Sequence, residues 1–286
     1  MKEFADGLWR LDGFPPNGFN AYLMGDVLID AGTRRARRRI LRQLKGREVA
    51  AHALTHAHFD HQGSSHAVCE ELEIPLLCPE GEADAMEGKG ETFGLIPENT
   101  VTRLQARYWA GPAHPVARRL REGDEVAGFQ VLETPGHSPG HVVFWRESDR
   151  VLVAGDVLNG MNLFTGLPGL HEPPRMFTVD PERNRESIRR IAGLEPALTV
   201  FGHGPPCRDP AKLAAFAEKL PACAQPPPPA AACARSPCAS TARPNSKRAS
   251  GSGTSCSPSP SSSGGSLRSC SCSARTVPMM NCASSA

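Results

Sequence analysis

Short, mainly apolar runs near the N-terminus predict a pair of strands. Residues 20–24 and 27–29 are two such runs, and the dipeptide Gly25-Asp26 between them favours a tight hairpin turn. The chain is therefore expected to open with β-strands.

Residues 34–46 show a different period. Ile40 and Leu44 lie at helical spacing, Thr33 is the predicted N-cap, and Gly46 ends the pattern. We interpret the six Arg of this segment as the solvated face of an amphipathic helix rather than as a binding patch for a polyanion.

Beyond this helix, a strand-like run followed by a turn-rich loop with His or Asp occurs four times. The runs are 48–54, 129–133, 151–154 and 198–201, and helical segments are predicted at 62–72, 181–192 and 210–220. Polar residues just beyond strand ends are how a rigid sheet places catalytic groups on loops. The alternation of strands and helices predicts an α/β layered fold.

The loop after the first of these runs reads His56-Ala57-His58-Phe59-Asp60-His61. In extended chain, His56 and His58 project to the same side and can reach one ion, whereas Asp60 and His61, past the bend, can reach a second. Imidazole and carboxylate ligands without a thiolate suit zinc, and also iron or manganese, in a site with room for water. The motif therefore predicts a metal site.

The HxHxDH pattern of this loop resembles the signature of the metallo-β-lactamase superfamily. Further elements of that family follow in order along the chain: a strand ending at Asp30, then Gly136-His137, Gly155-Asp156 and Gly202-His203. The resemblance covers residues 7–206.

The resemblance implies an αββα sandwich of two mixed β-sheets flanked by helices. It also implies a dinuclear centre with two Zn²⁺ per chain, or with Fe or Mn in their place. The implied ligands are His56, His58 and His137 for one metal, Asp60, His61 and His203 for the other, and Asp156 as a bridge between them. Asp30 matches the family's carboxylate that orients ligand imidazoles. We interpret His141 as a structural hydrogen-bonding residue beside the ligands.

The implied chemistry is hydrolysis by a hydroxide bound between two metals, with Asp60 both binding metal and moving the proton. We predict a hydrolase of an ester, thioester or lactone of a small molecule, similar to glyoxalase II and the lactonases. The bridging Asp156 disfavours a typical β-lactamase. Two other classes stay open: an oxidoreductase with a single iron that resembles persulfide dioxygenases, and a nucleic-acid-processing member.

Apolar residues give a candidate substrate pocket. Residues 84–125 form a stretch rich in Gly and Pro that is expected to be a lid or a helical insertion. The expected pocket residues are Phe93, Leu95, Ile96, Tyr108 and Trp109 in this stretch, then Met161, Leu163 and Phe164, with His171 at the border. His52, His66 and His114 are isolated in the sequence, and we interpret them as surface or core residues.

Composition divides the 286 residues at position 221. Residues 221–286 contain no Asp or Glu, 17 Ser, seven of the ten Cys and six of the 32 Lys and Arg, and we expect a disordered tail or the product of a shifted reading frame. Residues 1–220, the expected hydrolase domain, are mildly acidic, which disfavours nucleic-acid binding. No apolar run is long enough for a membrane helix or a signal peptide, so the sequence predicts a cytoplasmic protein.

Overall fold

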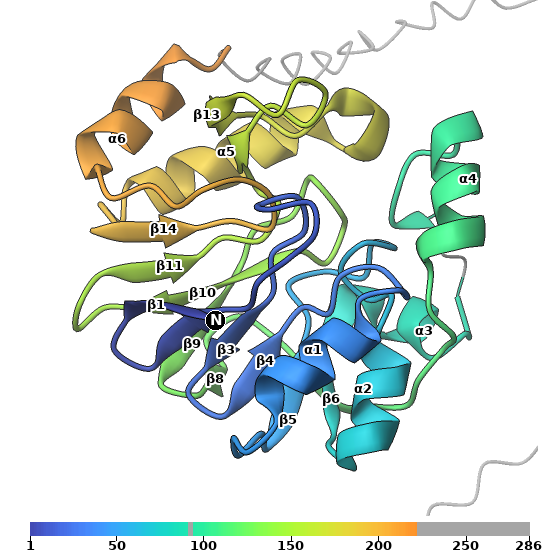
Figure 1. The fold of residues 1–286 in the computed structure, drawn as a ribbon. Helices are drawn as coiled ribbons and strands as arrows, with labels where there is room; N and C mark the ends of the chain where they lie inside the picture. The colour runs from blue at the N-terminus through green and yellow to red at the C-terminus, as the bar shows by residue number, and fades with distance from the viewer. Residues whose placement is uncertain (91–93, 222–286) are drawn as a thin grey trace, which may run out of the picture. The chain divides into compact units, whose positions relative to one another are not determined.

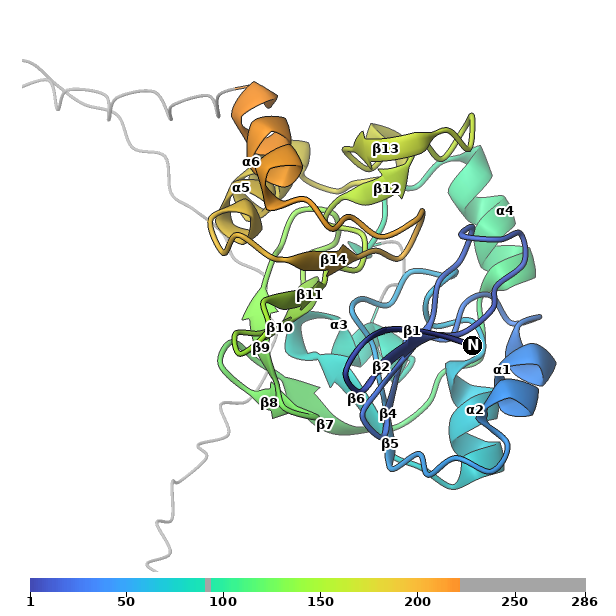
Figure 2. The ribbon, with the colours of Figure 1, turned by 60° about the vertical axis from the view of Figure 1, so that its left-hand side comes forward.

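A computed structural model gives the fold and describes residues 1–90 and 94–221. Two β-sheets lie face to face, and helices cover both outer surfaces (Figures 1 and 2). This arrangement confirms the predicted αββα sandwich. The prediction for residues 221–286 falls, apart from Pro221, outside the described residues.

The first sheet contains seven strands in chain order. They are β1 (Lys2–Ala5), β2 (Leu8–Arg10), β3 (Tyr22–Met24), β4 (Val27–Ile29), β5 (Ala51–Ala53), β6 (Leu76–Pro79) and β7 (Val116–Leu120). Strands β1 to β4 pair antiparallel, and β4 to β7 pair parallel, so the sheet is mixed. The predicted hairpin is confirmed: Tyr22 pairs with Ile29, and Gly25 in the turn has a φ of +59°, which glycine adopts readily.

The second sheet has the strand order β14-β11-β10-β9-β8. Its strands are β8 (Glu125–Val126), β9 (Phe129–Glu133), β10 (Val142–Arg146), β11 (Val151–Val153) and β14 (Leu198–Val200). All neighbours pair antiparallel except β11 and β14, which are parallel. A separate ribbon is formed by β12 (Asn159–Met161) and β13 (Pro168–His171).

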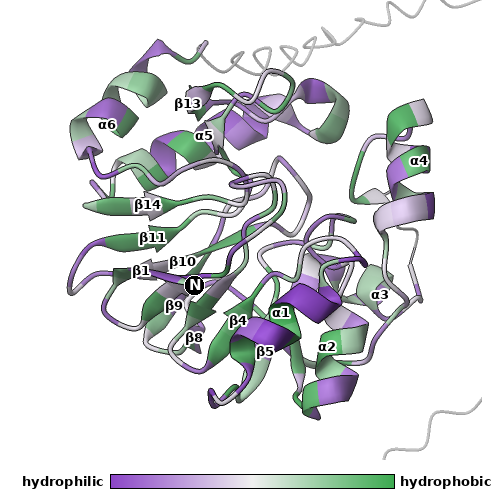
Figure 3. Ribbon diagram, in the orientation of Figure 1, coloured by the Kyte–Doolittle hydropathy of each residue, from purple (hydrophilic) through white to green (hydrophobic). Residues whose placement is uncertain are grey.

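The core between the sheets is built from alternate strand residues. Phe129, Phe144 and Ile29 are fully buried there, and the strands of both sheets are strongly apolar (Figure 3). Helices α1 (Arg37–Leu44), α2 (Ser65–Leu72) and α3 (Glu80–Met86) cover the first sheet. Helices α5 (Pro181–Ala192) and α6 (Pro210–Lys219) cover the second. Burial of these apolar faces is the main force that holds the layers together.

Two predicted helix starts are wrong. Helix α1 begins at Arg37 after Ala36, and Thr33 does not cap it, because the Thr33 carbonyl accepts from Ala36 in a preceding turn and Arg34 donates to the Trp109 carbonyl. Helix α2 begins at Ser65 rather than at residue 62. Before α2, the backbone N–H of Gln62 donates to the His58 carbonyl and that of Ser65 to the Gln62 carbonyl, so residues 62–64 form turns ahead of the helix.

The stretch 84–125, predicted to be a lid or a helical insertion, contains both a helix and a strand of the first sheet. It includes helix α4 (Thr100–Trp109) and also strand β7, which pairs with β6 in the first sheet. Asn99 caps α4 by accepting from the backbone of Thr102. In the part of the chain that the structure describes, no helix is both long and apolar enough to span a membrane.

Candidate metal centre

The polar residues singled out by the sequence converge at one end of the sandwich. Asp30 follows β4, the His56–His61 loop follows β5, His137 follows β9, Asp156 follows β11, and His203 follows β14. Strands from both sheets thus end at a common edge, and their loops meet there. The structure brings all seven predicted ligands into three overlapping groups of ligand atoms, each within 4.8 Å.

The first group is His56, His58 and His137. Their ring centroids lie 4.5 to 5.0 Å apart. The Nε2 atoms of His56 and His137 are buried and have no hydrogen-bond partner among the described residues. The Nε2–H of His58 donates to the Leu95 carbonyl at 2.8 Å, which leaves Nδ1 to face the group.

The second group is Asp60, His61 and His203. His203 Nε2 lies 3.3 Å from Asp60 Oδ2, and the Nε2 atom of His61 is buried with no hydrogen-bond partner in residues 1–90 and 94–221. Asp156 lies between the two groups. Its Oδ2 atom is 2.9 Å from His203 Nε2, 3.4 Å from His61 Nε2 and 3.7 Å from His137 Nε2.

Outer hydrogen bonds fix which nitrogen of each ring faces the centre. Asp30 Oδ2 accepts from the Nδ1–H of His61 at 2.8 Å, and the same carboxylate accepts from the backbone and the hydroxyl of Thr55. Thr55 Oγ1 in turn accepts from the Nδ1–H of His56 at 3.0 Å. Asp30 thereby orients two rings, the arrangement that commonly supports metal-binding imidazoles.

The two remaining rings are held by other segments. His137 Nδ1–H donates to Thr178 Oγ1 at 3.3 Å, and that hydroxyl donates onward to the Pro174 carbonyl. His203 Nδ1–H donates to the Gly18 carbonyl. Both rings therefore also turn Nε2 toward the centre.

The pKa values of the clustered residues shift in different directions. Burial, followed by the neighbouring imidazoles, holds the pKa of His56 well below its usual value. Burial alone would raise the pKa of Asp156, but His203 and His61 outweigh it and hold that pKa well below the usual range. Burial opposes a charge on His203 too, yet Asp156 and Asp60 raise its pKa to about 10.

These features fit a divalent metal pair. Four buried polar atoms, the Nε2 atoms of His56, His61 and His137 and Oδ1 of Asp156, have no hydrogen-bond partner in the described chain, and leaving such atoms unpaired is costly. All are nitrogen or carboxylate oxygen, the donors that zinc, iron and manganese accept. The seven donors therefore suit a dinuclear centre.

His141 and Gly202 lie directly against this centre. His141 Nε2 accepts from the backbone N–H of Asp156 at 3.0 Å and its Nδ1–H donates to Thr134, so neither nitrogen is left for an ion. A Cβ at Gly202 would lie 2.1 Å from Asp156 Oδ1. Glycine is required there because the backbone of the last loop passes against the Asp156 carboxylate.

Sequence reasoning missed Glu82 of α3, which is 1% exposed. One carboxylate oxygen accepts from the backbone N–H of Ala57, and the other accepts from the Ser138 hydroxyl and the backbone of Gly140 at 3.1 Å. Glu82 thus joins the loop of His56 and His58 to the loop of His137. No local signal marks it, because a single Glu in a short helix is ordinary in sequence.

A cavity of about 280 Å³ opens onto the metal centre. Its lining side chains include His58, Asp60, His137, Asp156 and His203 on the floor, and Phe19, Ile96, Gln105, Trp109, Met161, Leu163, Phe164 and Phe177 on the walls. Sequence reasoning did not find Phe19, Gln105 and Phe177. Phe19 connects wall and floor, since its ring lies 5.4 Å from that of Trp109 and 5.6 Å from that of His203.

Two predicted pocket residues are not on this wall. Tyr108 is 42% exposed, its ring contacts the Arg107 guanidinium, and it does not line the cavity that Gln105 and Trp109 line. His171 lies on β13 opposite Asn159. Phe93 lies outside the described residues.

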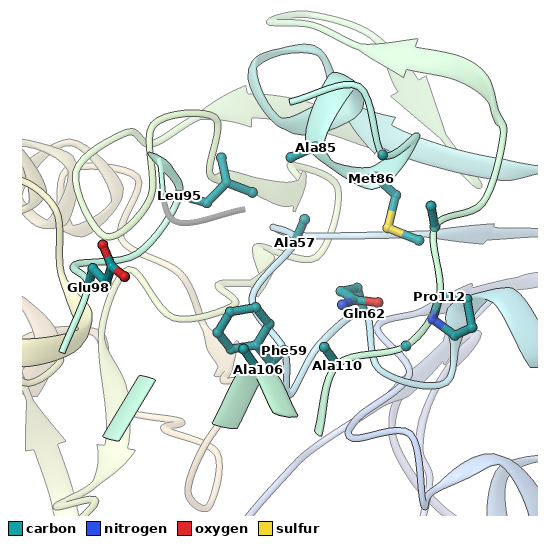
Figure 4. Close-up of a pocket in the computed structure, with 13 residues that line it drawn as sticks. Ala57, Phe59, Gln62, Ala85, Met86, Leu95, Glu98, Ala106, Ala110 and Pro112 are labelled. Atoms are coloured by element: carbon teal, nitrogen blue, oxygen red, sulfur yellow. The ribbon is translucent and has the colours of Figure 1, made fainter. Parts of the chain in front are cut away.

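Leu95 faces a different space. It lines a second cavity of about 490 Å³, together with Ala57, Phe59, Gln62 and Met86 (Figure 4). The described residues that line this cavity include none of the seven donor side chains.

Comparison with known proteins identifies the family. The model of the metallo-beta-lactamase superfamily matches residues 16–203. The chain belongs to this superfamily. The resemblance drawn from the sequence is thereby confirmed, whereas the seven-ligand type and the likeness to glyoxalase II remain predictions.

Among curated members, the probable metallo-hydrolase YflN of Bacillus subtilis is 33% identical over 202 residues, which are 63% of this chain and 75% of YflN. A hydroxyacylglutathione hydrolase of Bdellovibrio bacteriovorus is 27% identical over 54% of this chain, and the match spans only 48% of that enzyme. Among solved structures, BLEG-1 B3 metallo-beta-lactamase aligns with a TM-score of 0.53 and 30% identity, over 72% of this chain and 95% of that one.

Proposed function

We propose that the chain is a dinuclear metal-dependent hydrolase that cleaves an ester, thioester or lactone of a neutral small molecule. The observation that carries the proposal is the pair of His and Asp groups joined by Asp156 at the floor of an apolar cavity. The family membership and the relatives named metallo-hydrolases support it.

The seven donor side chains would hold two Zn²⁺, or Fe or Mn in their place. When bound, the two ions would lower the pKa of a water ligand toward neutrality and would polarise the substrate carbonyl. His56, His58 and His137 would hold one ion, Asp60, His61 and His203 the other, and Asp156 both. Asp30 and Glu82 keep these side chains in place through the hydrogen bonds described above.

Asp60 is the donor best placed to move a proton. Its side chain is 19% exposed, against 4% for His203 and 5% for Asp156, and it lines the cavity. Burial would raise the pKa of Asp60, but His203 and His61 outweigh it and lower that pKa, so the carboxylate is ionised at neutral pH. It can accept a proton from the attacking water and return it to the leaving group.

The walls favour a neutral acyl group. Phe19, Trp109, Met161 and Phe164 present carbon to the cavity, and its described lining contains no Lys or Arg. A substrate with several carboxylates, such as a glutathione thioester, would leave those charges without a cationic partner. Simple acyl esters, acyl thioesters and lactones match the cavity better.

A second candidate function is β-lactam hydrolysis, favoured by the 30% identity to BLEG-1 over 95% of that chain. An amide bond in a strained ring needs the same nucleophile and carbonyl polarisation. The two functions differ in substrate, so one panel of substrates separates them.

The test is metal content followed by turnover. Protein purified without chelator is expected to hold about two zinc ions per chain at the candidate centre, and to turn over p-nitrophenyl acyl esters, acyl thioesters or lactones faster than S-lactoylglutathione or nitrocefin. The Asp60→Asn variant, which loses one of the donors, should bind metal more weakly and lose most turnover even at saturating zinc. One iron per chain with oxygen uptake on a persulfide, or turnover of nitrocefin alone, would overturn the proposal.

A further inference from the structure

A second cluster of metal-binding side chains lies outside the centre already described. His66 and Glu70 are one turn apart on α2 and share a face of that helix. His114 lies between α4 and β7, and its backbone N–H donates to the Met86 carbonyl at 2.9 Å. His66 and His114 are isolated in the sequence, but the fold brings these two residues, 48 positions apart, together.

The distances in this cluster match those of a metal site. The Nδ1 atoms of His66 and His114 lie 3.2 Å apart, and His114 Nδ1 lies 3.7 Å from Glu70 Oε1. In a tetrahedral zinc site with Zn–N bonds of about 2.0–2.1 Å, two ligand nitrogens lie about 3.3 Å apart. One ligand atom from each of the three residues lies within 4.8 Å of the others.

A hydrogen bond between His66 and His114 accounts for the contact between the two rings, but not for the position of Glu70. One Nδ1–H shared between the two rings would satisfy the His pair, but Glu70 at 3.7 Å stays beyond hydrogen-bond distance. The Glu70 side chain is 64% exposed, so an ion can enter from solvent and keep a water ligand.

We propose that His66, Glu70 and His114 form a third metal site, which binds a divalent transition ion of the zinc class through two Nδ1 atoms and one carboxylate. Two imidazoles and a carboxylate suit Zn²⁺, Ni²⁺ or Cu²⁺ rather than Mg²⁺ or Ca²⁺. None of its three ligands belongs to the seven donors of the dinuclear centre.

The proposed third site lies between helix α2 and the segment that joins α4 to β7. Helix α2 follows the His56–His61 loop, and His114 comes five residues after Trp109 on the cavity wall. An ion bound by His66, Glu70 and His114 would link the segment that follows α4 to helix α2. The third ion would therefore reduce the motion of residues 110–116 without taking part in the reaction.

The experiment is zinc titration of chelator-treated full-length protein, read as bound ions per chain. The wild type is expected to bind one more ion than the His66→Gln/His114→Gln variant, and zinc bound elsewhere, including at cysteines of residues 222–286, cancels in this difference. In Glu70→Gln, the affinity for that ion should fall at least tenfold. Glu71→Gln is the matched control, because Glu71 is on the same helix but pairs with Arg37, and it should bind as the wild type does.

Hydrogen exchange gives a readout that does not depend on counting ions. Zinc added beyond saturation of the dinuclear centre should slow exchange at residues 110–116 in the wild type and in Glu71→Gln, but not in Glu70→Gln. Since Glu70 is at the surface, this variant keeps its fold. Equal stoichiometry in the wild type and the double variant, or equal zinc-dependent protection in wild type and Glu70→Gln, would overturn the proposal.

Discussion

The floor and the wall of the cavity are built differently. On the floor, His137, Asp156 and His203 are at most 5% exposed, and hydrogen bonds to Thr178 and to the Gly18 carbonyl fix the two rings. On the wall, Phe164 is 69% exposed, and α4 is linked to the segment beside it by a hydrogen bond from Asn99 to the Met176 carbonyl. The floor is part of the core, whereas the wall is a set of surface segments laid over it.

We infer from this difference that the floor carries the reaction and that the wall selects the substrate. Donor atoms must keep their positions to within fractions of an ångström, which requires the packed core and a complete set of outer hydrogen bonds. Wall segments require only the right shape and polarity, so they tolerate change. We therefore expect substitutions on the floor to affect metal loading and turnover, and substitutions on the wall to affect substrate affinity.

The largest effect is expected at the carboxylate between the two groups. Asp156→Ala removes the donor that lies within 3.7 Å of three imidazoles, so the number of ions held at the dinuclear centre should fall from two to one or fewer. Turnover should fall at least about 10³-fold, since several kcal/mol of carbonyl polarisation are lost. Metal analysis and kcat/KM measure this. Asp149→Ala, which changes a surface carboxylate paired with Arg146, is the control, and full activity with two bound ions in Asp156→Ala would contradict the bridging role.

An intermediate effect is expected beneath the floor, at Glu82. Glu82→Gln replaces one accepting oxygen by an NH₂ group, which cannot accept from the Ala57 backbone or from Ser138 and Gly140. One of the two ligand loops should loosen, and the affinity for metal should fall about 10- to 100-fold. Competition with a chelator measures that affinity. Glu80→Gln on the same helix alters only a surface pair with Arg121 and should stay within about twofold of wild type, so equal affinities in both variants would show that Glu82 has no positioning role.

The smallest effect is expected on the wall. Trp109→Ala removes apolar contact area, so KM for a long-chain acyl ester should rise about tenfold while kcat and metal content change little. The neighbouring Tyr108→Ala should leave KM unchanged, because that side chain is exposed and does not line the cavity. A large loss of kcat or of metal in Trp109→Ala would show that wall and floor are coupled, and would remove the distinction drawn above.

The sequence by itself determined the features that depend on neighbours along the chain. Spacing of apolar residues indicated the hairpin at Gly25 and the helix 181–192, because periods of two and 3.6 residues report which side of an element is buried. The His56–His61 motif was visible for the same reason, since its donors lie within six residues of one another. The αββα order of the layers came from the resemblance carried by that motif and the three Gly-containing pairs that follow it.

Only the tertiary structure decided what distant segments do together. It placed Glu82 between two ligand loops, brought His66 to His114, and put Phe19 rather than Tyr108 on the cavity wall. Each outcome depends on how the sheets pack and on which helix face turns inward. Such contacts join residues tens of positions apart through burial and hydrogen bonding, and no local spacing encodes them.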